Sequence, residues 1–286
     1  MRIDRALTLS VFGPLRGLVS ADTNASIPIL MYHSVAPDLD DKLGPYYRTV
    51  TSPQVFARQI DLLRAGGYSA ITLSQAIDLL RGPSTEPMLK QPRVVITFDD
   101  GFQDFYSDAF PILERAGFAA TVFMASDFVG KPFITGRKCL TATEIRMLSH
   151  KGIEFGSHSA SHRRLVELRT DELVKELSGS KAAIEGIVGR EVTLFSYPFR
   201  FPEENPQFTG TLARLLDEFG YRGGVTTAIG RSNRLDNPLF LPRLPVNDCD
   251  DDSLLQAKLA GHYDWLRSGQ RLRKQSRALW QKWAGA

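Results

Sequence analysis

Two adjacent carboxylates, Asp99 and Asp100, end an apolar run in the sequence and give the first indication of chemistry. The run, residues 93–98, consists mainly of β-branched and aromatic side chains, which predicts a buried strand that ends at Gly101. Two like charges this close raise each other's pKa unless a cation neutralises one of them. In α/β folds the carboxyl ends of strands are where ligands bind. The pair therefore predicts a site, and the alternative of an ordinary Asp-Gly turn or helix cap stays open.

Two of the five histidines, His158 and His162, lie four residues apart, just after a second short apolar run that ends at Gly156. If the chain turns helically there, both imidazoles face one side, which is a workable spacing for one metal ion. Histidine pairs also occur on surfaces and in cores without a metal. Combined with the two aspartates, the pair predicts a metal site of two imidazoles and one carboxylate.

Four segments of the chain resemble one known family. Residues 97–101 (Thr-Phe-Asp-Asp-Gly) and 158–162 (His-Ser-Ala-Ser-His) are similar to the first two motifs of the polysaccharide deacetylases, the NodB-like family or carbohydrate esterase family four. Residues 31–35 and 196–199 also resemble that family and are most similar to its poly-N-acetylglucosamine deacetylase branch. The resemblance covers about residues 27–250 and implies an α/β fold, a distorted (β/α)7 barrel. It further implies a metal-dependent hydrolase that removes N-acetyl groups from a glycan of N-acetylhexosamines.

The resemblance also implies roles for single residues. Asp99 would be the catalytic base, and Asp100, His158 and His162 would hold one divalent cation. Three protein ligands leave open positions for water and substrate, and such an ion acidifies water and polarises the acetyl carbonyl. Zinc is the default ion for these ligand types, and iron, nickel or cobalt would also accept them. The expected partner is an N-acetylated glycan.

The leaving amine needs a proton, and here the chain departs from the general family pattern. Most members carry an acid histidine in a late motif, where this chain has residues 241–246, Leu-Pro-Arg-Leu-Pro-Val. The poly-N-acetylglucosamine branch resembles a circular permutation that moves this histidine to the N-terminal side. His33 stands at that place, so we expect it to be the general acid. A purely structural histidine is the alternative.

Two further positions complete the expected catalytic set. The turn over residues 197–199 would direct the backbone N–H of Phe199 towards the developing oxyanion, or it is an ordinary proline turn. Ser196 stands just before it, where the family usually has an arginine. Arg243 would pair with Asp99 and keep it ionised, or it forms an ordinary surface ion pair.

Aromatic and basic side chains near these motifs are expected to contact the sugar. Pyranose faces can pack on aromatic rings in loops, although simple loop packing is the alternative for each residue. The residues expected to bind the substrate are Tyr46, Tyr47, Phe133, Tyr197 and Arg200. Asp104 and Asp108 follow the first motif, and we interpret them as first-turn acids favoured by the helix dipole rather than as catalysts.

Composition and length indicate a globular protein with one large domain. Hydrophobic residues make up 43% and charged residues 23% of the 286 residues. Strand and helix patterns alternate, which favours parallel βαβ units. A net charge of +3 is too small to indicate nucleic acid as a partner, and Cys139 and Cys249 do not make a disulfide framework. We expect an N-terminal extension over residues 1–26, a catalytic domain over 27–260 and a C-terminal tail over 261–286.

The two ends of the chain bear on membrane contact and compartment. No apolar run approaches the ~20 residues of a membrane helix. Pro14 and Arg16 interrupt the stretch that would be continuous in a signal peptide, so we expect a cytoplasmic or membrane-peripheral protein ahead of a secreted or periplasmic one. The tryptophans Trp265, Trp280 and Trp283 lie in a basic tail of the kind that contacts anionic membranes peripherally. The alternative, which we favour, is a final helix docked on the domain by its tryptophans.

Two alternative functions stay open at this point. The same residues would also hydrolyse a different acyl bond, such as an O-acetyl ester or a cyclic amide. The missing late histidine would also fit a glycan-binding module with a degenerate site. A panel of substrates and mutation of His33 distinguish these alternatives from an N-deacetylase.

Overall fold

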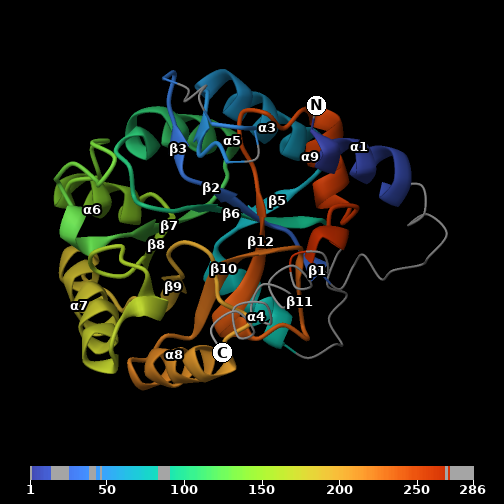
Figure 1. Cartoon of the computed structure of the whole chain (residues 1–286). Coiled ribbons are helices and arrows are strands. Elements are labelled where there is room, and N and C mark those ends of the chain that lie inside the picture. The colour runs from blue at the N-terminus through green and yellow to red at the C-terminus, as the bar shows by residue number, and fades with distance from the viewer. Residues whose placement is uncertain are drawn as a thin grey trace.

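The computed structural model describes residues 2–13, 26–38, 43–45, 47–82, 91–267 and 270. In this part of the chain, seven parallel strands close into a barrel in the order β2-β12-β10-β9-β8-β7-β6, and β6 pairs back to β2. Helices surround the barrel on its outside (Figure 1). The predicted (β/α)7 barrel is therefore confirmed. The strands of the ring are β2 (Ile29–Tyr32), β6 (Arg93–Phe98), β7 (Ala120–Met124), β8 (Ile153–Ser157), β9 (Leu194–Ser196), β10 (Gly223–Ile229) and β12 (Leu241–Pro245).

Short strands pair with one another or with a strand of the ring outside the closed barrel. β5 (Ser69–Ile71) pairs with the start of β6. Near the other end of the barrel, β3 (Ser34–Val35) pairs in parallel with β4 (Val50–Thr51), so the segment that follows β2 is fixed at the rim. β1 (Ser26–Ile27) pairs antiparallel with β11 (Ser232–Asn233).

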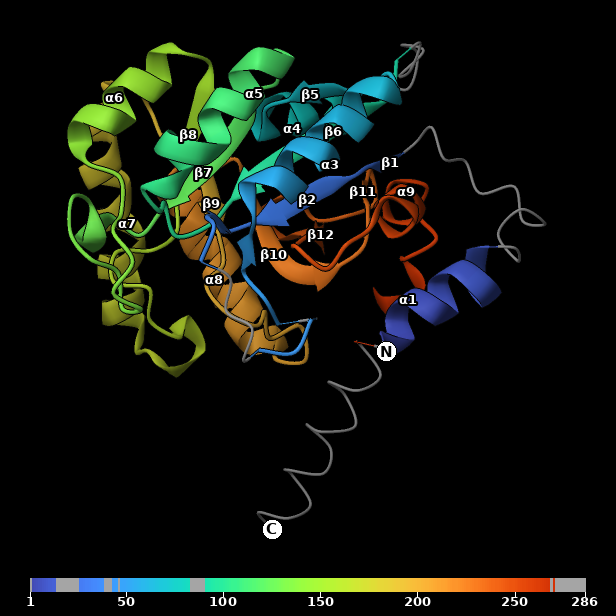
Figure 2. The ribbon, with the colours of Figure 1, turned by 90° about the horizontal axis from the view of Figure 1, so that it is seen from above.

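The helices begin where local capping chemistry favours it. Thr72 and Thr141 each form a capping box with the residue three positions later, and Pro53 and Pro206 occupy first helical positions. Figure 2 shows α3, α5 and α6 following one another along one side of the barrel. The α-helices are α1 (Ile3–Leu7), α3 (Pro53–Ala65), α4 (Leu73–Arg81), α5 (Phe110–Ala116), α6 (Ala142–His150), α7 (Thr170–Val188), α8 (Pro206–Glu218) and α9 (Asp252–Leu259), with a π-helical turn η3 (Phe105–Ala109) before α5.

The strands of the ring are covered on both faces, as parallel strands are in α/β folds. β7 is buried along its whole length, and so is β6 from its second residue. Phe98 at the end of β6 stacks on Tyr32 at the end of β2, with ring centroids 5.4 Å apart. This packing brings the ends of two neighbouring strands, and the residues that follow them, to the same edge of the barrel.

The described N-terminal segment packs against the described start of the tail. Phe12 stacks on Trp265 at a centroid distance of 4.6 Å, and the Trp265 indole N–H donates to the Thr8 hydroxyl at 3.0 Å. Arg2 pairs with Asp250, just before α9. Trp265 thus serves internal packing, which does not support membrane contact, while Trp280 and Trp283 lie outside the described residues. Among the helices of the described segments, none combines the length and apolar character needed to cross a bilayer.

Candidate active site

The carboxyl ends of the barrel strands surround an open cavity of about 800 Å³. Its walls come from the segments after β2, β6, β7, β8 and β9 and from β10 itself, so residues far apart in the sequence meet here. The predicted site residues that line it are His33, Asp99, Asp100, Phe133, His158, His162, Tyr197 and Phe199.

A sharp turn at the end of β6 places the two aspartates at the cavity. Asp100 and Gly101 both adopt left-handed backbone conformations, with φ of 68° and 67°. A Cβ on Gly101 would lie 2.2 Å from the Sδ atom of Met124 on β7, so only glycine fits. Asp99 and Asp100 are both buried, at 2% and 7% exposure, which is costly for two carboxylates unless positive charge is near.

Asp100 faces both histidines of the second motif. Its Oδ1 atom lies 3.5 Å from Nε2 of His158 and 3.3 Å from Nε2 of His162. One ligand atom from each of the three residues lies within 4.8 Å of the others. The expectation of a helical turn over the histidines is wrong, because Ser159 and His162 are left-handed, with φ of 63° and 53°. A tight loop, rather than a helix face, brings the two imidazoles together.

Surrounding groups fix the orientation of each imidazole. The Nδ1–H of His158 donates to the backbone carbonyl of Ser196 at 2.8 Å, which leaves the lone pair of its Nε2 free, beside Asp100, to bind a metal ion. The ring of His162 lies between Phe133 and Phe199, with centroids 5.1 and 4.6 Å away. Contacts within the protein therefore hold both imidazoles in place at the site.

The donor atoms fit a divalent cation. Oδ1 of Asp100, which faces the Nε2 atoms of both histidines, is buried without a hydrogen-bond partner in the described part of the chain. Burial and the neighbouring His158 lower the pKa of His162 to about 4, so its imidazole is neutral, the form that binds metals. Two imidazoles and a carboxylate that converge on one point, with lone pairs facing each other, match the ligand set of zinc and related ions.

Asp99 has a different environment, because Arg243 on β12 binds it in a fork. The Arg243 nitrogens lie 2.8 and 2.6 Å from the two carboxylate oxygens, and the Ser196 hydroxyl donates to Oδ1 at 3.1 Å. Burial alone would raise the pKa of Asp99, but Arg243 holds it well below its usual range. Arg243 thus favours the ionised form of Asp99. Ser196 is also 3.2 Å from Arg243, so the small residue leaves room for this guanidinium.

His33 and Phe199 reach the same cavity from opposite parts of the ring. His33 directly follows β2, where the Asp99 backbone N–H donates to the Tyr32 carbonyl at 3.0 Å, so His33 and Asp99 stand at adjacent strand ends. Phe199 has a left-handed backbone with φ of 60°, is 44% exposed and touches His162 with its ring. The acid role of His33 and the oxyanion role of the Phe199 N–H stay predictions.

The predicted sugar-binding residues divide into two groups. Tyr197 lines the cavity although it is 98% buried, and it packs edge-on against Phe201. Arg200 does not line the cavity, since its guanidinium pairs with Glu204, four residues further along the chain. Tyr47 is 69% exposed and does not line it either. Tyr46 lies outside the described residues.

Asp104 lies at the start of η3, as expected, and it has further partners that the sequence did not indicate. Its carboxylate caps no helix N–H but accepts hydrogen bonds from the Ser34 hydroxyl at 2.5 Å and the Val35 N–H at 3.2 Å. Arg137, a residue that sequence reasoning missed, approaches the same carboxylate at 3.3 Å and lines the cavity. No local sequence pattern predicts this contact, because β3 and the hairpin that carries Arg137 are distant in sequence and become neighbours only in the folded barrel.

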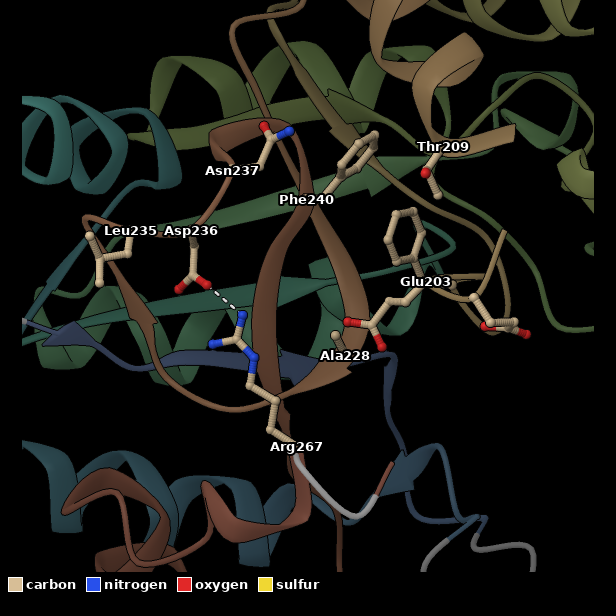
Figure 3. A pocket seen from close by; sticks show the side chains of 10 residues that line it. Glu203, Thr209, Ala228, Leu235, Asp236, Asn237, Phe240 and Arg267 are labelled. Carbon is tan, nitrogen blue, oxygen red and sulfur yellow. Dashed lines mark hydrogen bonds and ion pairs between the residues drawn. The ribbon is translucent and has the colours of Figure 1, made fainter. Parts of the chain in front are cut away.

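A second hollow of about 420 Å³ lies apart from this cavity and shares no lining residue with it. Phe201, Phe240 and Ala228 form its apolar part, and Arg267 pairs with Asp236 across it (Figure 3). None of the predicted metal ligands lines this hollow, so the chemistry belongs to the larger cavity.

Comparison with known proteins agrees with the geometry. A family model described as polysaccharide deacetylase matches residues 87–223. YxkH of Bacillus subtilis (strain 168), whose name places it provisionally among polysaccharide deacetylases, is 30% identical over 230 residues, 80% of this chain and 74% of that protein. The poly-beta-1,6-N-acetyl-D-glucosamine N-deacetylase of Escherichia coli (strain K12) is 31% identical over 103 residues, 36% of this chain and 14% of that protein. The structure of IcaB from Ammonifex degensii has a TM-score of 0.68 and 25% identity, covering 82% of this chain and 97% of that one.

Proposed function

Since the chain belongs to the polysaccharide deacetylase family and is therefore a hydrolase, we propose that it removes N-acetyl groups from N-acetylhexosamine glycans with the help of one divalent cation. One observation carries the proposal: three ligand atoms of Asp100, His158 and His162 converge beside a second, separately neutralised carboxylate, Asp99. A cation held by the three ligands would lower the pKa of a water molecule and polarise the acetyl carbonyl.

In this proposal Asp99 receives the proton of the attacking water. Arg243 keeps it ionised, and it lies next in sequence to the ligand Asp100, at the same strand end. The same ion pair makes Asp99 a weak base, so it can take the proton only from water that has been made acidic. The base must therefore lie beside the metal ligands, where a cation would acidify the water.

In this proposal His33 protonates the leaving amine. It lines the cavity at the end of β2, beside Asp99 rather than among the ligands. When water attacks the acetyl carbon, the C–N bond of the amide breaks, and the amine nitrogen leaves with a proton from an acid. The products are acetate and the free amine of the sugar.

The substrate class follows from the relatives and from the cavity. The Escherichia coli relative is named for poly-β-1,6-N-acetyl-D-glucosamine, and we propose the same class of glycan here. The cavity is open and large enough for a sugar residue, and the partly exposed ring of Phe199, with His162 and the Arg164 guanidinium beside it, offers an apolar edge that a sugar can contact.

Acetate release from fully acetylated β-1,6-glucosamine oligomers, with and without a chelator, tests the proposal. We expect release from the purified protein, its loss after chelation, and its return when zinc, iron, nickel or cobalt is added back. O-acetylated sugars in the same panel serve as the comparison. Release only from the O-acetyl esters, or release that survives complete removal of the metal, would contradict the proposal.

A further inference from the structure

We propose that Arg137 and Asp38 form a strap across one side of the active-site cavity, which directs the enzyme to a residue at the end of a glycan chain. The proposal rests on the N-deacetylase function proposed above. The strap is a bidentate ion pair, with nitrogen–oxygen distances of 3.1 and 2.9 Å. Both residues line the cavity.

The topology of the barrel shows what the strap crosses. β2 and β7 are the two ring neighbours of β6. Asp38 lies in the segment after β2, and Arg137 lies in the hairpin after β7. Their ion pair therefore joins the segments on either side of the short connection that follows β6, which carries Asp99 and Asp100, and it bounds the cavity on that side.

Besides its ion pair with Asp38, Arg137 has contacts with Asp104 and Phe102 that hold it in place. It contacts the Asp104 carboxylate at 3.3 Å, and that side chain is only 10% exposed and fastened to Ser34 and Val35. The guanidinium also lies 6.0 Å from the centroid of the Phe102 ring. The base of the strap is thus anchored in the protein, while its other end, Asp38, is 70% exposed.

The hairpin that carries Arg137 is itself tied to the β6 connection. The Phe133 N–H donates to the Arg137 carbonyl at 2.7 Å, and the Leu140 N–H donates to the Gly101 carbonyl at 2.9 Å. Cys139 forms a β-bridge with Phe102. Opening of this side therefore requires the Arg137–Asp38 pair to separate rather than the hairpin to move.

The opposite side of the cavity has a different character. The residues that line it are uncharged: Tyr197 and Phe199 from the segment after β9, and Thr227 within β10. The Arg164 guanidinium lies over the Phe199 ring at 5.5 Å from its centroid but does not line the cavity. A glycan that enters over Phe199 reaches the ligands and then meets the strap. A chain end fits this shape, whereas an internal residue needs room for sugars on both sides.

The test compares a fully acetylated β-1,6-glucosamine disaccharide with the hexasaccharide. The measured quantity is the ratio of kcat/KM for the hexasaccharide to that for the disaccharide, in wild type and in Asp38→Ala. We expect the ratio to rise about twofold to fivefold in the variant, since an exposed ion pair of this kind restricts opening by about that factor. Arg137→Gln, which keeps much of the stem but loses the fork, should shift the ratio in the same direction.

The matched control is Asp78→Ala. Asp78 also forms an exposed pair with an arginine distant in sequence, Arg222, at 3.2 Å, and it does not line the cavity. We expect this variant to leave both rates unchanged. The site of reaction is read by mass spectrometry of end-labelled hexasaccharide, where wild type should deacetylate a terminal residue and Asp38→Ala should also reach internal ones.

The outcomes separate the two proposals. If wild type releases acetate but both strap variants keep the wild-type ratio, or if wild type attacks internal residues as readily as Asp38→Ala does, the strap is wrong and the proposed function stands. If wild type releases no acetate from either oligomer, the proposed function falls, and the strap with it.

Discussion

Arg243 and Asp99 form a bidentate ion pair that joins β12 to β6 across the strand between them, β2, on whose end His33 stands. The side chain of Arg243 is fully buried and that of Asp99 is 3% exposed. Arg243 also donates to the Thr226 carbonyl and to the Thr97 hydroxyl, so its donors are used on several strands. A buried pair of this kind is costly to break from one side, because the remaining charge has no partner.

Replacement of Arg243 should therefore harm both folding and activity. We expect Arg243→Ala to lower the free energy of unfolding by about 3–5 kcal/mol, measured by urea titration, because Asp99 is left buried and unpaired. The double variant with Asp99→Ala should lose less than the sum of the two single losses. Additive losses would show that the two side chains do not depend on each other.

Replacement of His33 should affect turnover without affecting the ligands. We expect His33→Gln to lower kcat by about 10²- to 10⁴-fold, the usual contribution of a general acid, while the metal content stays at the wild-type value. His150→Gln, at the exposed end of α6, is the matched control and should leave kcat unchanged. A variant at His33 that keeps full kcat would assign this residue a structural role.

Gly101 should be intolerant of any side chain, and Gly117 allows the reason to be isolated. Both have nearly the same left-handed backbone, with φ of 67° and 68°, but a Cβ on Gly117 would meet nothing within 4 Å. Gly117→Ala should cost about 1 kcal/mol of unfolding free energy from backbone strain alone. Gly101→Ala should cost more, since the methyl group would collide with Met124. Equal losses in thermal or urea unfolding would contradict the collision.

Asp104 should make stability depend on pH in a direction unusual for an aspartate. Burial raises its pKa to about 6, above the ordinary value of 3.8, although Ser34, Val35 and Arg137 each favour the charged form. The folded protein therefore binds the proton more tightly, so this stabilisation is present below about pH 4 and is lost as the pH rises through about 6.

The comparison of wild type with Asp104→Asn isolates this effect from other titrating groups. We expect the variant to gain about 1–3 kcal/mol relative to wild type between pH 4.5 and 7.5, in urea titrations of metal-free protein. A stability difference that stays constant over this range, or that changes in the opposite direction, would show that the pKa of Asp104 is not raised in the folded protein.

The resemblance to a known family implied the seven-stranded barrel and the roles of the central residues, whereas the residues themselves predicted parallel βαβ units and a metal site of two imidazoles and one carboxylate. A buried strand that ends in Asp-Asp-Gly and a histidine pair after a second strand are visible without the fold. The partners of Asp104 were not predictable, since β3 and the hairpin of Arg137 are about 100 residues apart and meet only once the ring closes. The expected helical turn at His158 failed because the spacing of two histidines does not distinguish a helix from a tight loop.

Arg200 shows a different limit of sequence reasoning. It lies next to Phe199, which lines the cavity, but its guanidinium finds Glu204 four residues further on. Proximity in sequence to a motif predicts that a backbone is near the site, but the direction of a long charged side chain depends on the nearest opposite charge.

Metal analysis of the purified variants tests the central claim most directly. The claim is that Asp100, His158 and His162 hold one cation. Asp99 instead takes the proton of the attacking water and does not bind the cation. Elemental analysis should find about one divalent ion per chain in wild type and in Asp99→Asn, with kcat lowered about 10²- to 10⁴-fold in the latter. His158→Ala should lose the ion, and His150→Ala should keep it. A His158→Ala protein that retains both its metal and full acetate release would contradict the account.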